Sequence, residues 1–320
     1  QHFGVRNDNQ VFLDKYRKFY EKIVIPFIDK YEITNVLCLG DSFDKRKSIN
    51  YNSLESAKDM WFTPLAERGI HMDMLIGNHD IYFKNTLRVN SPSLLLSEYD
   101  NINVVDTPRE INYDGQSILL IPWICDDNRN ETLRCIEESD ADICMGHLEL
   151  NGFEAIPGHV MDHGDDPSIF EKFKLVCSGH FHMKSRRGNV NYLGNPYQLY
   201  WGDYGQQRGF HVLNTDTTKL TFLPNPYNIF QKIYYDDTRK IKLPGNLKGS
   251  FVKLVVEKKT DQEFFDIMVH NLQQMGCADL KIVEDLTIDL DDVDEAIETE
   301  DTLTTLERCV AELENKDDIF

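Results

Sequence analysis

In the first third of the chain, segments with helical spacing of apolar residues alternate with short continuous apolar runs. In segment 12–31, FLDKYRKFYEKIVIPFIDKY, apolar residues recur every three to four positions, which predicts an amphipathic helix. The short apolar run NVLCLG comes next and predicts a buried strand. The same pair then recurs, because NSLESAKDMWFTPLAERG predicts a second helix that Gly69 ends, and HMDMLIG predicts the next strand. This alternation of helix and strand indicates an α/β fold.

Short strand-like runs dominate the region that follows. They are apolar and bounded by Gly, Asn or Asp, and they read SILLIPW, ADICMG, FKLVCSG, VNYLG and GFHVLN. Helix–strand alternation in front of such a strand-dense region predicts two sheets that pack face to face with helices outside them. We therefore expect one two-sheet α/β sandwich over residues 1–224.

The two prolines of LPNPYN mark a domain boundary after residue 224. Beyond it, SFVKLVVEK and DLKIVEDL predict strands, and DQEFFDIMVHNLQQMG predicts a helix. Thr260 or Asp261 would cap the start of that helix and Gly276 would end it. These elements predict a small α+β capping domain over residues 225–285.

The remaining segment, residues 286–320, combines an acidic stretch with an apolar stripe. DLDDVDEAIETED predicts a solvated linker, and four apolar residues then recur at helical spacing: Leu303, Leu306, Val310 and Leu313. A helix of this length is not stable alone, so it must dock on another surface, either on the capping domain or on a partner.

Composition and charge bound the cellular context. Hydrophobic residues make up 41 % of the chain, enough for a sizeable core. The longest apolar run, ILLIPWI, is too short to cross a bilayer, and the first fifteen residues lack the apolar stretch of a signal peptide. The seven cysteines form no CxxC pair. These features predict no membrane association and a reducing, cytoplasmic compartment.

The formal net charge of −20 is unevenly distributed. Residues 284–320 contain 15 acidic and 2 basic side chains, whereas residues 232–259 contain 8 basic and 3 acidic ones. The acidity is therefore concentrated in the C-terminal segment, and a basic island remains in the capping domain. The acidic total does not exclude a nucleic-acid partner.

Four predicted strands end in glycine followed by a residue that can bind a metal ion. The ends are CLGDSFD, LIGNHD, CMGHLE and CSGHFH, which contribute Asp41, Asn78, His147, His180 and His182. Side chains beyond the carboxyl ends of strands collect in one crevice. Oxygen and imidazole ligands without cysteine suit a pair of Mn²⁺, Fe²⁺ or Zn²⁺ ions, and such a pair can clamp the oxygens of a phosphoryl displacement. The pattern predicts a metallophosphoesterase site.

The tripeptide Asn78-His79-Asp80 carries two further interpretations. We interpret His79 as a transition-state stabiliser or as an acid for the departing oxygen, with Asp80 holding its imidazole. The alternative is structural, because Gly77-Asn78 is a common turn pair and Asp80 could cap the segment that follows. For the other histidines a structural role is the default, although His159 and His163 lie in a loop-like stretch, PGHVMDHGDD, that could reach substrate.

The order GDxFD, GNHD, GH, GHxH resembles the calcineurin-like metallophosphoesterase superfamily. Within it, IPWICDD, MGHLELNGFEAIPGH and YLGNPYQLYWGD resemble the SbcD-like DNA repair and recombination nuclease subunits, in particular those of T-even-type phages. The resemblance implies Mn²⁺-dependent hydrolysis of DNA phosphodiesters, as an exonuclease on duplex ends and an endonuclease on single strands. It also implies a C-terminal helix that binds an SbcC-like coiled-coil ATPase, a homodimer within a heterotetramer, and the host cytoplasm as location.

The resemblance assigns the ligands to two ions, Mn²⁺ or alternatively Mg²⁺ or another divalent ion. His2, Asp41 and His182 would hold the first; Asp41 as a bridge, Asn78, His147 and His180 would hold the second. Family members begin with a strand ending Asp-x-His, and this sequence opens at Gln1-His2. We expect a chain that starts at Gln1 to hold its first metal weakly and to have badly impaired activity.

Cations that follow the ligand turns are candidates for DNA phosphate contacts. They are Lys45 and Arg46 in DKRK, and Lys184, Arg186 and Arg187 in KSRR. Two alternative functions stay open. One is a phosphoprotein phosphatase of the same superfamily, from whose motifs GDxxDRG and RGNHE this chain departs. The other is an architectural subunit that tethers DNA ends with impaired catalysis.

Overall fold

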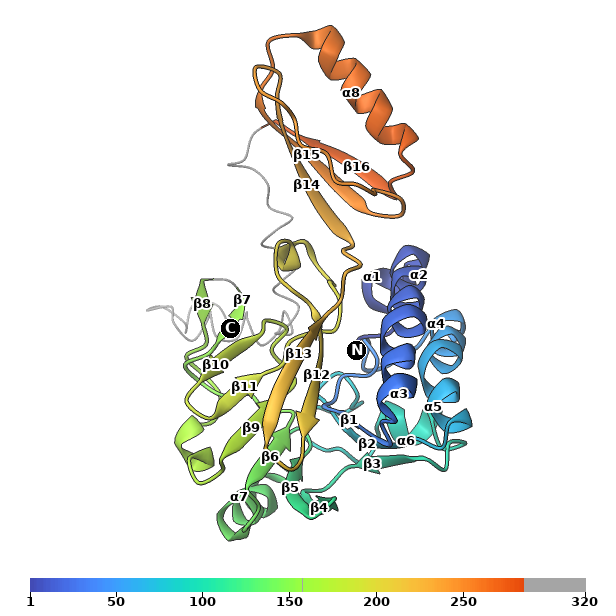
Figure 1. Ribbon diagram of the computed structural model, residues 1–320. Helices are drawn as coiled ribbons and strands as arrows, with labels where there is room; N and C mark the ends of the chain where they lie inside the picture. Colours follow the sequence, from blue (N-terminus) through green and yellow to red (C-terminus); the bar gives the residue numbers. More distant parts are fainter. Residues whose placement is uncertain (157, 285–320) are drawn as a thin grey trace, which may run out of the picture.

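The computed structural model describes residues 1–156 and 158–284, and it places two sheets face to face (Figure 1). The first sheet consists of three parallel strands, β1 (Asn35–Cys38), β2 (His71–Leu75) and β3 (Ile102–Val105). The second has the order β10 (Ser185–Arg187), β11 (Val190–Tyr192), β9 (Leu175–Ser178), β6 (Ile143–Gly146), β5 (Gln116–Ile121) and β4 (Arg109–Tyr113). One buried apolar cluster contains side chains from both sheets, among them Leu75, Val105, Leu120 and Met145. The predicted two-sheet sandwich is confirmed.

Helices cover the outer face of the first sheet. They are α2 (Gln10–Phe19), α3 (Ile25–Tyr31), α4 (Tyr51–Ala57) and α5 (Thr63–Glu67), with the short α1 (Val5–Asp8) in front of them. Their apolar faces form a large core with Met72 and Met74 of β2. The spacing of apolar residues predicted this packing.

Each of the two long helices predicted from the sequence is divided by a π-helical turn. The turns are Tyr20–Val24 and Lys58–Phe62, and each is followed within two residues by a proline, Pro26 or Pro64. Proline has no backbone N–H to give to the helical ladder, so the wider turn lets a new helix start with proline in its first turn. The periodic pattern does not reveal this interruption, because the apolar face continues across it.

The outer face of the second sheet packs on α7 (Arg129–Glu138) and on the 3₁₀ turn η3 (Pro167–Phe170) around a second core. The remaining elements near the sandwich are α6 (Ser91–Leu95), the hairpin of β7 (Glu154–Ile156) and β8 (His159–Val160), the turn η4 (Trp201–Asp203) and the hairpin of β12 (Gly209–Asn214) and β13 (Lys219–Pro224).

A smaller unit lies at one end of the molecule (Figure 1). Its sheet contains β14 (Phe230–Asp236), β15 (Phe251–Lys258) and β16 (Asp279–Val283) in parallel pairs, and α8 (Gln262–Gln274) packs on it with the side chain of Asp261 as N-cap. The predicted strands and helix of the cap are thus present. The exact division into domains stays a prediction, and the linker and helix expected at 286–320 lie outside the described residues.

Two of the compositional expectations can be compared with the structure. Within residues 1–156 and 158–284, no helix is long and apolar enough to cross a membrane. The six cysteines in this part of the chain are free thiols, and Cys38, Cys125, Cys144 and Cys177 are buried.

Candidate metal centre

Four strands from the two sheets end at one place. Asp41 follows β1, Asn78 and His79 follow β2, His147 follows β6, and His180 and His182 follow β9. Because the strands that carry these residues are parallel to their neighbours, their carboxyl ends share one edge of each sheet. The structure therefore brings together the metal-ligand candidates that the sequence placed on separate turns.

At this edge the backbone adopts conformations that residues other than glycine rarely adopt. His2, Asp41 and His180 have φ of 53°, 52° and 73°, in the left-handed region. Gly77 has no room for a side chain, because a Cβ there would overlap the carboxylate of Asp41. Strained residues that cluster at one point are typical of a functional site.

The first group of ligand atoms surrounds the Asp41 carboxylate. Asp41 Oδ2 lies 3.2 Å from His147 Nε2, and Asn78 Oδ1 lies 2.9 Å from the same nitrogen and 3.0 Å from His180 Nδ1. One ligand atom each from Asp41, His147 and His180 lies within 4.8 Å of the others. All donors are oxygen or imidazole nitrogen, so the set suits Mn²⁺ or another borderline divalent ion.

The hydrogen bonds of His147 test whether this group fits a cation. His147 Nδ1 lies 2.6 Å from the carbonyl oxygen of Leu39, which can only accept, so Nδ1 carries a proton. Its other nitrogen, Nε2, then faces two oxygens, of Asp41 and Asn78. Burial lowers the pKa of His147, but the Asp41 carboxylate, the Leu39 carbonyl and the Asp80 carboxylate together raise it by more. His147 Nε2, Asp41 Oδ2 and Asn78 Oδ1 thus point at one another, and a metal ion bound between them would satisfy all three.

A second group lies on the other side of Asp41. His2 Nε2 is 3.7 Å from Asp41 Oδ2, and the rings of His2 and His182 are 4.7 Å apart. His2 Nδ1 lies 3.3 Å from Asp44 Oδ1, and His2, Asp44 and His79 form a second set of ligand atoms within 4.8 Å of one another. Burial holds the pKa of His2 and His182 well below the usual value. Both imidazoles are therefore neutral, the form that binds metals.

The interpretation of Asp80 needs a correction. We expected Asp80 to hold the imidazole of His79, but its fully buried carboxylate accepts hydrogen bonds from backbone N–H groups instead. The closest donors are the N–H groups of Asp41 at 2.8 Å, Gly77 at 2.9 Å and Ser42 at 3.0 Å, and the Phe43 N–H and the Ser91 hydroxyl donate at 3.4 Å. Asp80 therefore fastens the turn after β1 to the turn after β2. The sequence could not show this, because the closest donors are main-chain groups brought near by the fold.

The imidazole of His79 is held by a different group. His79 Nδ1 lies 2.6 Å from the carbonyl oxygen of Asp44, and the backbone N–H of His79 donates to Asp41 Oδ1 at 2.8 Å. Because the carbonyl can only accept, Nδ1 carries a proton and Nε2 is left for another partner. His79 is partly exposed, unlike the buried Asn78 and His147 around it.

Sequence reasoning missed two carboxylates that the structure places beside the histidines. Asp44 belongs to the same GDSFD motif as Asp41, and we considered it only as a neighbour of basic residues. Glu149, two residues after His147, lies 3.8 Å from His180 Nε2 and 3.3 Å from His163 Nε2. Burial raises the pKa of Glu149, but its two histidine neighbours lower it by more. Each carboxylate belongs to a motif that also contains a metal-ligand candidate, GDSFD for Asp44 and GHLE for Glu149. The sequence does not show how far each carboxylate lies from the histidines.

The candidate DNA contacts lie outside the buried site, on two separate segments. Lys45, 3.8 Å from Asp8 Oδ2, and the half-buried Arg46 follow Asp44. Lys184, Arg186 and Arg187, which we call the β10 cations, are exposed on and before the edge strand β10. Lys184 Nζ lies 3.4 Å from the centre of the Phe222 ring. Their role in DNA binding stays a prediction.

Comparison with known proteins supports these motifs over most of the chain. No protein-family model matches the sequence. A protein of phage T4, exonuclease subunit 1, is 34 % identical over 293 residues, which cover 89 % of this chain and 84 % of that protein. A solved archaeal phosphodiesterase is 10 % identical, with 67 % of this chain and 93 % of that chain covered, and has a TM-score of 0.34. On the sequence relationship, the chain belongs to the family of SbcD-like nuclease subunits within the calcineurin-like metallophosphoesterase superfamily.

Proposed function

We propose that this protein is a two-metal nuclease that hydrolyses DNA phosphodiesters, as the subunit of a recombination or repair complex. The relative with which it shares 34 % identity is named an exonuclease subunit. The observation that carries the proposal is the convergence of four side chains, Asp41, Asn78, His147 and His180, whose neighbouring polar atoms lie 2.9–3.2 Å apart. His2 and His182 lie on the other side of Asp41.

Each side chain has a proposed role in the site that follows from its charge and protonation state. His2, Asp41 and His182 would hold one divalent ion, and Asp41, Asn78, His147 and His180 the other, with Mn²⁺ as the preferred ion. When bound, such a pair supplies a nucleophile at neutral pH and stabilises developing charge. Asn78 contributes an oxygen without adding a negative charge, so the phosphate meets less repulsion than a second carboxylate would cause.

His79 is the proposed acid for the departing oxygen. The Asp44 carbonyl fixes the tautomer and the ring orientation through Nδ1, so Nε2 is the atom that would hold the proton for the leaving group. Asp80 acts on the reaction indirectly, because it holds the backbone of Asp41 and thereby the position of its carboxylate. Asp80 is thus a positioning residue.

DNA contacts and partners follow from the family. The proposed substrates are duplex ends for exonuclease and single strands for endonuclease activity, with Lys45, Arg46 and the β10 cations as phosphate contacts. The word "subunit" in the name of the phage T4 relative supports a partner, for which we propose an SbcC-like coiled-coil ATPase and a homodimer of this chain in a heterotetramer. The free cysteines support a reducing compartment such as the host cytoplasm.

A direct test measures cleavage of a labelled DNA duplex and a labelled single strand with and without Mn²⁺. The wild-type protein should cut both only with the metal, and His79→Ala should lower kcat by 10²- to 10⁴-fold, about the contribution of general acid catalysis, with unchanged Mn²⁺ affinity. A phosphopeptide in the same assay tests the phosphatase alternative. Turnover of the phosphopeptide in preference to DNA would contradict the proposal.

A further inference from the structure

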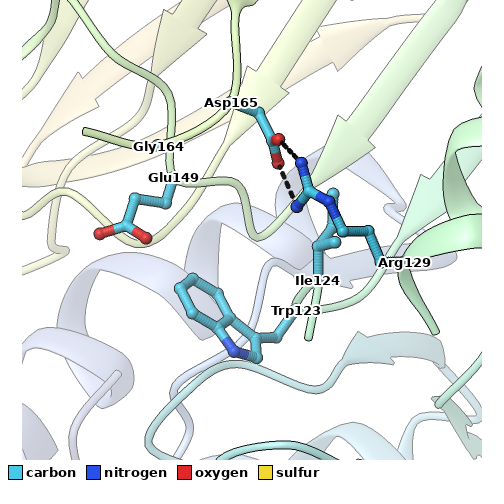
Figure 2. A pocket seen from close by; sticks show the side chains of 6 residues that line it. All are labelled: Trp123, Ile124, Arg129, Glu149, Gly164 and Asp165. Carbon is cyan, nitrogen blue, oxygen red and sulfur yellow. Dashed lines mark hydrogen bonds and ion pairs between the residues drawn. The ribbon is translucent and has the colours of Figure 1, made fainter. Parts of the chain in front are cut away.

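A pocket of about 230 Å³ lies next to the metal centre at the same strand edge (Figure 2). Its lining comes from segments that follow β5 and β6, from the start of α7 and from the loop after β8: Trp123, Ile124, Arg129, Glu149, Gly164 and Asp165. The ring of Trp123 is 5.0 Å from the ring of His180 and 5.9 Å from that of His147. A group in this pocket is therefore adjacent to a phosphate at the metal centre.

The wall of the pocket combines one aromatic face with charged groups. Figure 2 shows the indole of Trp123 and the carboxylate of Glu149 on one side, and the ion pair of Arg129 with Asp165 on the other. The two carboxylates outnumber the one guanidinium, so the lining repels a phosphate group and accepts an uncharged ring with hydrogen-bond donors. Carboxylates accept from the amino groups of nucleobases.

The backbone of Trp123 is fixed on both sides, although the indole is only partly buried. Its N–H donates to the carbonyl oxygen of Ile76 at 2.8 Å, directly before the glycine of the Asn78 turn. Its carbonyl oxygen accepts from Asn128 Nδ2 at 2.9 Å. The backbone of Trp123 is therefore already in place before a ligand stacks on its indole, so binding does not have to order this segment.

We propose that the Trp123 pocket receives one unpaired base of the DNA strand whose phosphate lies at the metal centre. The base stacks on the Trp123 indole, and the Glu149 and Asp165 carboxylates accept hydrogen bonds from its edge. Stacking on an aromatic side chain is tolerant of sequence and requires an unpaired base. The pocket thus favours single strands and frayed ends over intact duplex. This proposal rests on the proposed nuclease function and names a subsite for its substrate.

The test compares two single strands of equal length, one with bases and one in which tetrahydrofuran units replace every base. Wild-type kcat/KM should be about 5- to 150-fold higher for the strand with bases, the ratio that ~1–3 kcal/mol of stacking per base gives. Trp123→Leu keeps apolar volume but removes the stacking face, so it should lower kcat/KM on the strand with bases and leave the abasic strand unchanged. Trp123→Phe should restore most of the preference.

Two controls separate a base subsite from general effects. Tyr31→Leu removes an exposed aromatic ring at the end of α3, next to the amino end of β1 and so at the edge opposite the metal centre, and it should change neither rate. An equal loss on both strands in Trp123→Leu, or no preference in the wild type, would overturn the proposal, because Trp123 would then only pack against the histidines.

A binding measurement without metal keeps this inference separate from the nuclease function. A single strand carrying 2-aminopurine should lose fluorescence on binding to the wild-type protein and keep it on binding to Trp123→Leu. If neither strand is cut but this quenching is seen, the nuclease function fails and the base pocket stands. If DNA is cut but the wild-type protein gives no quenching at any 2-aminopurine position, the pocket fails and the nuclease function stands.

Discussion

Replacing Asp80 by asparagine tests whether its carboxylate holds the two ligand turns together. The substitution keeps the size of the side chain but exchanges one oxygen for an NH₂ group. In its three shortest hydrogen bonds, Asp80 Oδ2 accepts from Asp41 and Gly77, and Oδ1 accepts from Ser42. The single oxygen of asparagine can serve only one side.

The expected loss follows from these three hydrogen bonds. If the oxygen stays with Asp41 and Gly77, the buried N–H of Ser42 faces an NH₂ group, which costs about 1–3 kcal/mol. The two remaining bonds lose their charged acceptor, at about 1 kcal/mol each. Against this, burial and the Asp41 carboxylate disfavour the charge of Asp80 in the folded protein and raise its pKa. The neutral asparagine recovers part of that cost, so Asp80→Asn should lower the free energy of unfolding by about 1–3 kcal/mol. It should also weaken Mn²⁺ binding, because the Asp41 backbone is no longer fastened.

Urea denaturation at pH 7.5 with a chelator present measures this loss in the metal-free protein. Burial and the Asp41 carboxylate raise the pKa of Asp80 to about 6, so the side chain is ionised at this pH. Asp140→Asn, which changes an exposed carboxylate between α7 and β6, is the matched control and should leave stability within about 0.5 kcal/mol of the wild type. A loss below 1 kcal/mol in Asp80→Asn would refute the fastening role.

Three further predictions concern the surroundings of the site. Arg208→Leu leaves the buried carboxylate of Asp203 without its cation and should cost about 3–5 kcal/mol in urea denaturation; no gain in stability on adding Asp203→Asn to this variant would contradict it. Glutamine at all three β10 cations should reduce the slope of log affinity for duplex DNA against log salt by up to about 2.7, and an unchanged slope would reject their phosphate contacts. Burial and the Lys184 charge lower the pKa of His211 to about 4, below the value near 6.5 of the unfolded chain. Between pH 6.5 and about 4 the unfolded chain therefore binds a proton at His211 that the folded protein does not, and the fold loses stability as the pH falls, so Tm should fall less steeply over this window in His211→Phe than in the wild type.

Much of the fold could be predicted from the sequence because local patterns and burial agree. The runs NVLCLG, HMDMLIG and ADICMG become the strands β1, β2 and β6, of which β2 and β6 are almost fully buried and β1 is buried only at Cys38, and Asp261 caps α8 as expected. The hidden features are those that local patterns do not encode. The π-helical turns before Pro26 and Pro64 leave the apolar face unbroken, and in β14, FQKIYYD, the apolar and aromatic residues stand at 230, 233, 234 and 235, which is neither strict alternation nor one continuous apolar run.

The site shows the same division between local and long-range information. Glycine before each ligand marks the ends of four strands, and the parallel topology then brings these ends together. By contrast, Asp80 binds the main-chain N–H groups of Asp41 and Ser42, and His79 lies next to the Asp44 carbonyl, all of them more than thirty positions away in the sequence. No side-chain motif specifies such a partner, so the role of Asp80 was predicted wrongly while its presence at the site was predicted correctly.

Anomalous diffraction at the manganese edge, from crystals grown with Mn²⁺, tests the central claim most directly. The account predicts two peaks that share the Asp41 carboxylate, one contacted by Asn78, His147 and His180 and the other by His2 and His182. A single peak away from Asp41, or histidines that only hydrogen-bond to one another in saturating Mn²⁺, would contradict it.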